Sequence, residues 1–168
     1  PQWPVSFFAT LLIGAISVPL NAWWTGRELH YALEDSGARV LIVDAERHDR
    51  VAPWCEQLPS LEHLFVGLDA ILGPTSAWAG LEDLPCPDEP IDADEDATIF
   101  YTSGTTGHPK GALGTHRNTI NSVWSAAHLG ARNFLRRGQA VPLPDPKAAQ
   151  RANLLSVPFF HVTGCQAI

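Results

Sequence analysis

A short segment of the sequence carries most of the residue types that could bind a phosphate group. Residues 102–111 are Thr-Ser-Gly-Thr-Thr-Gly-His-Pro-Lys-Gly. The three glycines allow the backbone to bend closely around a ligand and to adopt positive φ angles, and successive amides in such a turn form a concave nest for an anion. Four hydroxyl groups add donors with little bulk, and Lys110 adds a point positive charge. The segment therefore predicts a polyphosphate-binding loop.

Two common nucleotide-binding patterns do not fit this segment. The P-loop requires Gly-Lys followed directly by Ser or Thr, whereas here Pro109 precedes Lys110 and Gly111 follows it. The dinucleotide fingerprint Gly-x-Gly-x-x-Gly is absent. A flexible hairpin loop without a ligand is the plainer interpretation. The ordered string directly after the apolar run 97–101 nevertheless favours a binding loop with a rigid base.

The charges divide unevenly along the chain. Residues 1–100 hold four Lys or Arg and 17 Asp or Glu, which gives a net charge of −13. Residues 101–168 hold seven Lys or Arg and one Asp, which gives a net charge of +6. An anionic ligand should therefore favour the second part. Nucleic acid is disfavoured as a partner, because no interleaved aromatics and no recognition-helix motif accompany the cations. These cations are Lys110, Arg117, Arg132, Arg136, Arg137, Lys147 and Arg151.

Composition and cysteine usage bound the class of protein. The chain has 168 residues, of which 45% are hydrophobic and 17% charged, which excludes a disordered tail and a small disulfide scaffold. Cys55, Cys86 and Cys165 are few and dispersed, which fits a reducing, cytoplasmic location, and the histidines lack zinc-ligand spacing. Because the chain has no methionine and begins Pro-Gln, we expect it to be a piece of a larger protein.

The first 26 residues are uncharged and mostly apolar. A membrane helix needs about 20 consecutive apolar residues, and Gly14 and Pro19 interrupt this run. A signal peptide is also disfavoured, because no basic region precedes the run. We therefore expect a buried helix from Val5 to about Ile13 and a buried strand over about 16–20.

The next segment has the pattern of a strand, a helix and a strand. Thr25 and Glu28 form a capping box at a helix start, and Gly37 can end that helix in the left-handed conformation. An apolar stripe of Leu29, Ala32 and Leu33 lies between them. The continuously apolar run 40–43 predicts a strand covered on both faces. This order predicts an α/β fold with a layered, mixed and largely parallel sheet and flanking helices.

Further elements follow before and after the loop. An amphipathic stretch spans 50–58, a strand 63–67, and irregular structure 73–96 with an acidic connector at its end. Strands are expected over 97–101 and 112–114, and a helix from about 118. A basic, Pro-rich excursion covers 132–152, and a last buried strand 154–157. The helix from 118 should bury a stripe made of Ile120, Val123, Trp124, Ala127 and Ala131.

The segment 101–111, Tyr-Thr-Ser-Gly-Thr-Thr-Gly-His-Pro-Lys-Gly, closely resembles the signature loop of the adenylate-forming (AMP-binding) superfamily, which includes acyl-CoA synthetases, luciferases and peptide-synthetase adenylation domains. Two other segments agree in order and spacing. Residues 14–21 are similar to the family's early strand, and residues 155–164 to its substrate-side Pro-x-Phe-His-x-x-Gly motif. The resemblance implies that residues 1–168 are part of the family's large N-terminal domain and that its C-terminal domain is absent.

The resemblance implies a two-step ligase. A carboxylic acid attacks ATP with Mg²⁺ present, pyrophosphate leaves, and coenzyme A then converts the acyl-adenylate to a thioester. Thr106 and Lys110 are the expected catalytic residues, and Thr106 carries the most consequential hydroxyl. Preorganised donors would stabilise the charge that builds on pyrophosphate. The expected phosphate contacts are Thr102, Ser103, Gly104, Thr105, Thr106, Gly107 and Lys110.

The resemblance also assigns residues to the acid. His161 resembles the residue beside the carboxylate and thioester passage, and its plainer interpretation is a half-buried structural histidine. Phe160 is the expected acyl-pocket residue, although Phe159 and Phe160 could equally belong to the core. No residue of this chain is expected to be a metal ligand.

Substrate and activity stay partly open at this level. The excursion 132–152 resembles an insertion of some bacterial fatty-acid–CoA ligases, so a fatty acid is the first expectation and an aryl or amino acid the second. Because the adenine, ribose and hinge segments and the C-terminal lysine lie outside the chain, residues 1–168 alone should be inactive. A non-catalytic nucleotide-binding module, or an interaction domain whose basic part holds an acidic partner, is the alternative.

Overall fold

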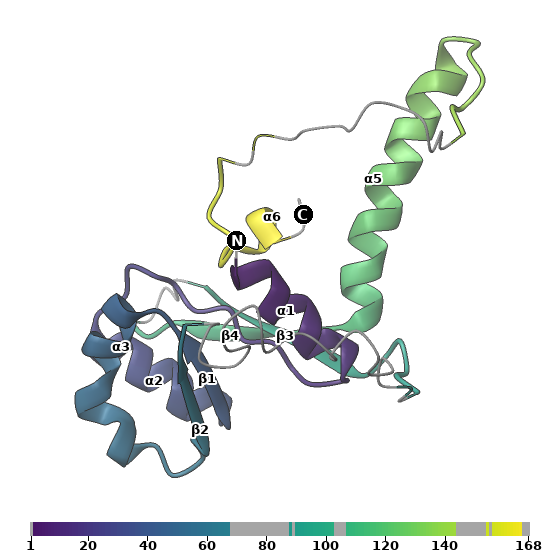
Figure 1. Ribbon diagram of the computed structural model, residues 1–168. Coiled ribbons are helices and arrows are strands. Elements are labelled where there is room, and N and C mark those ends of the chain that lie inside the picture. The colour runs from purple at the N-terminus through teal and green to yellow at the C-terminus, as the bar shows by residue number, and fades with distance from the viewer. Residues whose placement is uncertain are drawn as a thin grey trace, which may run out of the picture.

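The computed structural model describes residues 2–67, 88, 90–102, 107–143, 154 and 156–165. Its elements are α1 (Gln2–Leu12), α2 (Gly26–Ser36), β1 (Val40–Val43), α3 (Ala45–Val51), the 3₁₀ helix η1 (Ala52–Gln57), β2 (His63–Val66), β3 (Asp96–Thr102), β4 (Lys110–Thr115), α5 (His116–Arg136) and α6 (Val162–Cys165). Figure 1 shows α2, α3, β1 and β2 gathered on one side, the β3–β4 hairpin across the middle, and α5 extending away from the end of β4. The expected α/β class is thereby confirmed.

Helix α2 forms as its sequence predicts. The Thr25 side chain accepts a hydrogen bond from the Glu28 amide, and the Thr25 amide donates to the Glu28 carboxylate at 2.8 Å. Gly37 ends the helix with φ of +62°. The expected stripe is buried, and Leu29 and Leu33 form a core cluster with Val51 and Leu58.

Two short strands lie beside this helix in a parallel pair. Val40 of β1 is in register with His63 of β2, and Val43 with Val66. The expectation that β1 is covered on both faces is wrong for the described residues, because Val40 and Ile42 are 49% and 38% exposed. A continuous apolar run cannot distinguish a strand covered on one face from one covered on two.

The amphipathic stretch around residue 50 forms the end of α3 and then η1. Pro53 lies in the first turn of η1, where its missing N–H costs no hydrogen bond. From α3, Arg47 and Arg50 both donate to the Ala22 carbonyl, at 3.0 and 3.1 Å. These bonds hold the segment that precedes α2. The backbone approach is so close that a Cβ on Gly26 would lie 2.1 Å from the Arg50 carbonyl oxygen.

The N-terminal expectations are met only in part. Helix α1 forms, but among its described side chains only that of Phe7 is buried, at 4% exposure, whereas Val5 and Leu12 are more than half exposed. The strand expected over about 16–20 contracts to a single parallel bridge between Ser17 and Thr98. This bridge attaches β3 to the N-terminal segment.

The second part of the chain departs most from expectation. Helix α5 starts at His116 with a capping box between Thr115 and Asn118, and it continues to Arg136, into the segment expected to be irregular. None of its residues is buried, so the expected buried stripe is wrong. Near the C-terminus, the described residues of 154–157 form no strand, and Leu154 is 97% exposed.

Candidate functional site

The segment that we expect to bind phosphate begins and ends at the tip of a β-hairpin. Strands β3 and β4 pair antiparallel, with Thr102 opposite Lys110 at the last position of the ladder. The Thr102 hydroxyl donates to the Lys110 carbonyl at 3.4 Å. Residues 103–106, which include Thr106, lie outside the described residues. The two ends of the expected loop are therefore joined by the β3–β4 ladder, and the strand expected before the motif is confirmed.

The two described glycines of the motif have different roles. Gly107 has φ of +100°, and a Cβ at that position would meet nothing within 4 Å. It provides the left-handed backbone that the sequence led us to expect. Gly111 has no positive φ. Instead, a Cβ on Gly111 would lie 2.7 Å from Cγ2 of Ile99 and 3.4 Å from Cζ of Tyr101. Its lack of a side chain makes room for neighbours on β3.

Two side chains that sequence reasoning missed connect this hairpin tip to α2. The Tyr101 hydroxyl lies 2.6 Å from Oδ2 of Asp35 and 3.2 Å from the Ala32 carbonyl oxygen. The His108 ring packs on the Tyr31 ring with 5.0 Å between centroids. A tyrosine next to the loop was visible in the sequence, but no pattern pointed to a partner 66 positions away.

The described cations of residues 101–168 do not gather in one region of the structure. Lys110 is exposed at the hairpin tip. Arg117 forms a bidentate ion pair with Asp94, at 2.6 and 2.9 Å, which lowers the pKa of the Asp94 carboxyl. Arg132 and Arg136 lie far along α5, which leaves the hairpin at the end of β4 opposite the loop (Figure 1). In the described part of the chain, Lys110 is thus the only cation of residues 101–168 at the tip.

The substrate-side motif lies against the N-terminal part of the chain. The Phe159 ring stacks on Trp3, with centroids 5.7 Å apart, and the Phe160 ring meets Trp23 edge-on at 5.2 Å. The exposed His161 ring packs beside the Phe160 ring, with 4.8 Å between their centroids. Within the described ranges, no hydrogen bond or ring contact joins this motif to the β3–β4 hairpin. Both phenylalanines therefore have packing partners that explain them without a ligand.

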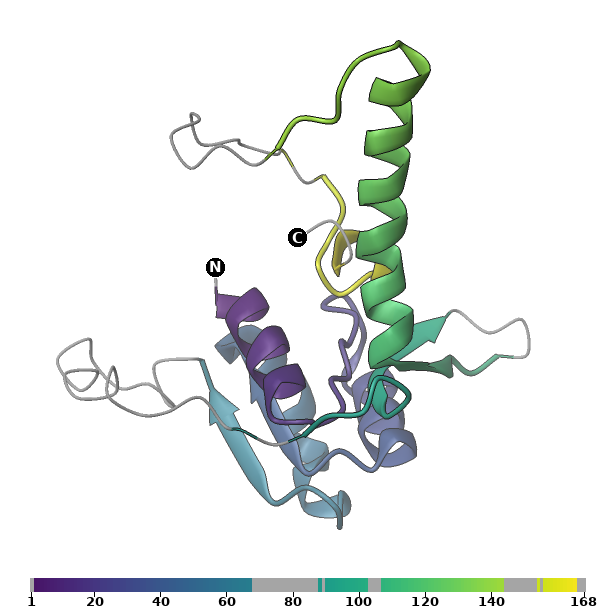
Figure 2. The ribbon, with the colours of Figure 1, turned by 90° about the vertical axis from the view of Figure 1, so that its right-hand side faces the viewer.

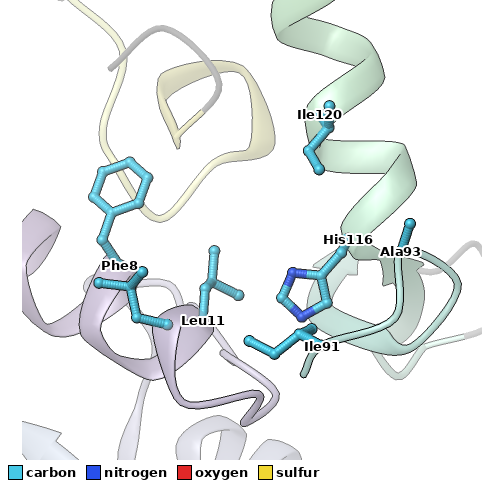
Figure 3. Close-up of a pocket in the computed structure, with 7 residues that line it drawn as sticks. Phe8, Leu11, Ile91, Ala93, His116 and Ile120 are labelled. Carbon is cyan, nitrogen blue, oxygen red and sulfur yellow. The ribbon is translucent and has the colours of Figure 1, made fainter. Parts of the chain in front are cut away.

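An apolar cleft of about 320 Å³ opens between α1, residues 91–93 and the start of α5. Figure 3 shows the His116 ring directed toward the side chains of Leu11 and Ile91. The Nε2 atom of His116 is buried and has no hydrogen-bond partner. Since β4 separates His116 from Lys110, this cleft is distinct from the hairpin tip. Its lining residues are Phe8, Leu11, Leu12, Ile91, Ala93, His116 and Ile120.

The described ranges hold no group of three or more His, Cys, Asp or Glu side chains suited to a metal ion. They also include no helix that is both long and apolar enough to cross a bilayer. The donors at the hairpin tip are a hydroxyl, an ammonium group and the backbone around Gly107. This donor set suits a polyphosphate oxygen better than a cation.

Comparison with known proteins agrees with the loop motif. A model of the family described as AMP-binding enzyme matches residues 1–168. A long-chain-fatty-acid–CoA ligase, FadD15 of Mycobacterium bovis, is 29% identical over 95% of this chain, and a feruloyl-CoA synthase of Amycolatopsis is 33% identical over 96%. The chain spans 28% and 27% of the length of these two relatives.

Solved structures show the same relationship in three dimensions. The anthranilate CoA ligase AuaEII, in complex with anthranoyl-AMP, matches 73% of this chain with a TM-score of 0.58 and 32% identity, and the match spans 24% of its own chain. The N-terminal domain of FACL13 from Mycobacterium tuberculosis matches 99% of this chain and 37% of its own, with a TM-score of 0.69 and 23% identity. The second likeness concerns the fold alone.

Proposed function

The chain belongs to the AMP-binding enzyme family, and on this basis we propose that the full-length protein is an ATP-dependent acid–thiol ligase. A carboxylate oxygen attacks the α-phosphorus of ATP, the bond to pyrophosphate breaks, and an acyl-adenylate forms. The sulfur of coenzyme A then loses its proton and attacks the acyl carbon. AMP leaves as the thioester forms.

The observation that supports this proposal is the pairing of Thr102 with Lys110 at the base of a Gly- and hydroxyl-rich loop. Negative charge builds on the departing pyrophosphate, and donors held in place before the reaction stabilise such charge without reorganisation. Lys110 is at the hairpin tip for this task. The Thr102 hydroxyl, which donates to the Lys110 carbonyl in this structure, would turn its proton to the phosphate when ATP binds. We assign the remaining phosphate contacts to Gly107 and, in the segment outside the described residues, to Ser103, Gly104, Thr105 and Thr106.

Mg²⁺ and coenzyme A belong to the proposal as well. Mg²⁺ usually binds through substrate phosphates and one or two carboxylates, and it would neutralise charge on the triphosphate. Hydroxyl groups of the kind that the loop sequence carries suit such a metal–phosphate complex chemically, whereas the described residues offer no carboxylate cluster for it. We propose that residues 1–168 are part of a large N-terminal domain and that they do not turn over alone. Free thiols on Cys55 and Cys165 fit a reducing, cytoplasmic location.

We propose a fatty acid as the first substrate class. Relatives named as long-chain-fatty-acid–CoA ligases support it, and so does the basic, Pro-rich segment 132–152. An aryl acid is the second candidate, because a benzoate–CoA ligase and a feruloyl-CoA synthase are similar to this chain at 31% and 33% identity. On the acid side we assign His161 to substrate positioning and Phe160 to the wall of the acyl pocket.

The test is carboxylate-dependent pyrophosphate release by the full-length protein, with short, long and aromatic acids supplied in turn. Release that rises with one acid class identifies that class. Replacing Thr106→Ala should lower the rate by about 100-fold, the usual loss for one transition-state donor. Thr119→Ala on α5 is the matched control and should leave the rate unchanged. Binding of Mg·ATP without release for any acid would instead support a non-catalytic nucleotide-binding module.

A further inference from the structure

The loop end of the β3–β4 hairpin has few backbone attachments to the rest of the protein. The Ser17 amide donates to the Ala97 carbonyl at 2.8 Å, and the Ile99 amide donates to the Ser17 carbonyl at 3.0 Å. Neither bond lies beyond the middle of β3 on the side of the loop. Beyond them, the described attachments of the hairpin tip are side-chain contacts: those of Tyr101 and His108 with α2, and that of Tyr101 with Trp24.

Tyr101 is placed so that one hydroxyl joins the hairpin to a helix. It is the last residue but one of β3, next to Thr102 and directly opposite Gly111. Because Gly111 has no side chain, the Tyr101 ring can lie across β4 at that position. The ring also meets Trp24 edge-on, with centroids 6.0 Å apart. The hydroxyl then reaches the carboxylate of Asp35 and the carbonyl of Ala32.

Helix α2 is a firm support for this contact. A capping box fixes its start, Gly37 in the left-handed conformation fixes its end, and three buried side chains fix its inner face in the core. Asp35 lies on its last turn, close to the Gly37 cap. A hydrogen bond to Asp35 therefore ties the hairpin to one of the best-packed parts of the molecule.

We propose that Tyr101 and Asp35 are positioning residues that hold the phosphate-binding hairpin at a fixed distance from α2, and that this anchor sets the affinity for Mg·ATP. The proposal rests on the proposed function, since it concerns the same loop. A fixed tip places Thr102 and Lys110 before the nucleotide arrives. Without the anchor, part of the binding free energy would be used to order the tip, which weakens binding.

The chemistry of the pair suits a permanent anchor. Burial, together with the hydrogen bond to the Asp35 carboxylate, raises the pKa of the Tyr101 hydroxyl far above its ordinary value. The phenol therefore keeps its proton, and its ability to donate, at neutral and moderately alkaline pH. A bond from a neutral donor to a charged acceptor is worth more than a neutral pair.

The test compares conservative variants of the full-length protein. Tyr101→Phe removes one oxygen and keeps the ring, and it should raise the KM for Mg·ATP about tenfold, as expected for losing a hydrogen bond to a charged group. The KM for the carboxylate and the kcat should change less than about twofold. Asp35→Ala should match this effect, and Asp35→Asn, which still offers an acceptor, should restore most of the affinity. Glu34→Ala, an exposed neighbour on α2, is the control and should be silent.

A merely structural role would give a different pattern. General destabilisation lowers the amount of active protein, and so lowers the apparent kcat without raising the KM for one substrate only. Unchanged KM for Mg·ATP in Tyr101→Phe, or equal rises for both substrates, would overturn the anchor. Amide hydrogen exchange at residues 102 and 110, the last pair of the β3–β4 ladder, should accelerate in Tyr101→Phe, and unchanged exchange would also count against the anchor.

The same experiment separates the anchor from the proposed ligase activity. If no acid gives pyrophosphate release, direct Mg·ATP binding replaces the KM. Weaker binding in Tyr101→Phe would then support the anchor while the ligase fails. Robust release in the wild type together with unaltered nucleotide dependence in Tyr101→Phe would leave the ligase standing and reject the anchor.

Discussion

Helices α2 and α5 begin with the same kind of cap but differ in how far their side chains are buried. Each starts with a threonine capping box, and each carries an apolar stripe at helical spacing. Yet α2 buries Leu29, Ala32 and Leu33, whereas α5 buries none of its residues, and Val123 and Trp124 are 64% and 69% exposed. In both ribbon views α5 extends beyond the other described helices and strands (Figure 2).

The difference shows what an amphipathic pattern can and cannot establish. The spacing of apolar residues fixes which face of a helix can be buried. Whether that face is buried depends on a second element that packs against it, and the described residues supply one for α2 but not for α5.

The largest expected effect comes from one substitution made in both helices. Leu33 is 3% exposed and Leu129 is 58% exposed. Leu33→Ala should lower the free energy of unfolding by about 2–5 kcal/mol, because it leaves a cavity in the core. Leu129→Ala should change it by less than about 0.5 kcal/mol. Urea denaturation of the 168-residue chain measures both, and similar losses would show that α5 is packed after all.

A second contrast uses a glycine from each helix. At Gly26, a Cβ would lie 2.1 Å from the Arg50 carbonyl oxygen, a backbone atom that cannot rotate away. Gly26→Ala should therefore cost about 1–3 kcal/mol of stability. At Gly130, a Cβ would meet nothing within 4 Å. Gly130→Ala should instead stabilise the chain by about 0.5–1 kcal/mol through helix propensity. Thermal unfolding should give melting temperatures that move in opposite directions, and a shared direction would contradict the contrast.

The smallest expected effect is a difference between the two capping boxes in how their contribution to stability depends on pH. Hydrogen bonds from Thr25 lower the pKa of the Glu28 carboxyl, whereas Asn118 in the other box does not titrate. The stabilisation by Glu28 is thus complete above the ordinary glutamate pKa of about 4.3, and it is lost as pH falls through the lowered value. Since Glu28 is largely exposed, the change should be only about a few tenths of a kcal/mol.

Two isosteric variants test this difference. Glu28→Gln keeps an acceptor but cannot titrate, so it should remove that part of the pH dependence. Asn118→Asp places a carboxylate in the second box, so it should add a similar dependence to α5. The readout is the urea midpoint at pH 7 and pH 3, relative to the wild type. Identical pH profiles for all three proteins would show that the boxes do not differ electrostatically.

Much of the candidate site could be predicted because its signals are local. The residues of 97–101 specify a strand that leads into the loop, and β3 confirms it, although it extends one residue beyond the expected run at each end. The positive φ of Gly107 follows from its place in the turn. The motif also indicated the family, which the match over residues 1–168 confirms. The roles of the loop residues and of His161 stay predictions.

Other features could not be predicted, because they depend on where distant segments meet. The sequence suggested a flexible backbone at Gly111, whereas the structure shows that this position makes room for Ile99 and Tyr101 on the neighbouring strand. The basic second part suggested one anion-binding region, whereas Arg117 is paired with Asp94 and the charges on α5 lie beyond the hairpin. The net charge of a segment gives the number of its charged residues but not where their side chains lie in the fold.

By itself, the sequence determined the caps of α2 and α5, the strand before the loop and the donors that the loop carries. Each of these depends on groups within about four residues of one another, where backbone geometry fixes the neighbours. Only the tertiary structure decided that Tyr101 bonds to Asp35, that Phe159 stacks on Trp3 and that α5 is left uncovered. These contacts join residues far apart along the chain, and their partners follow from how whole elements pack.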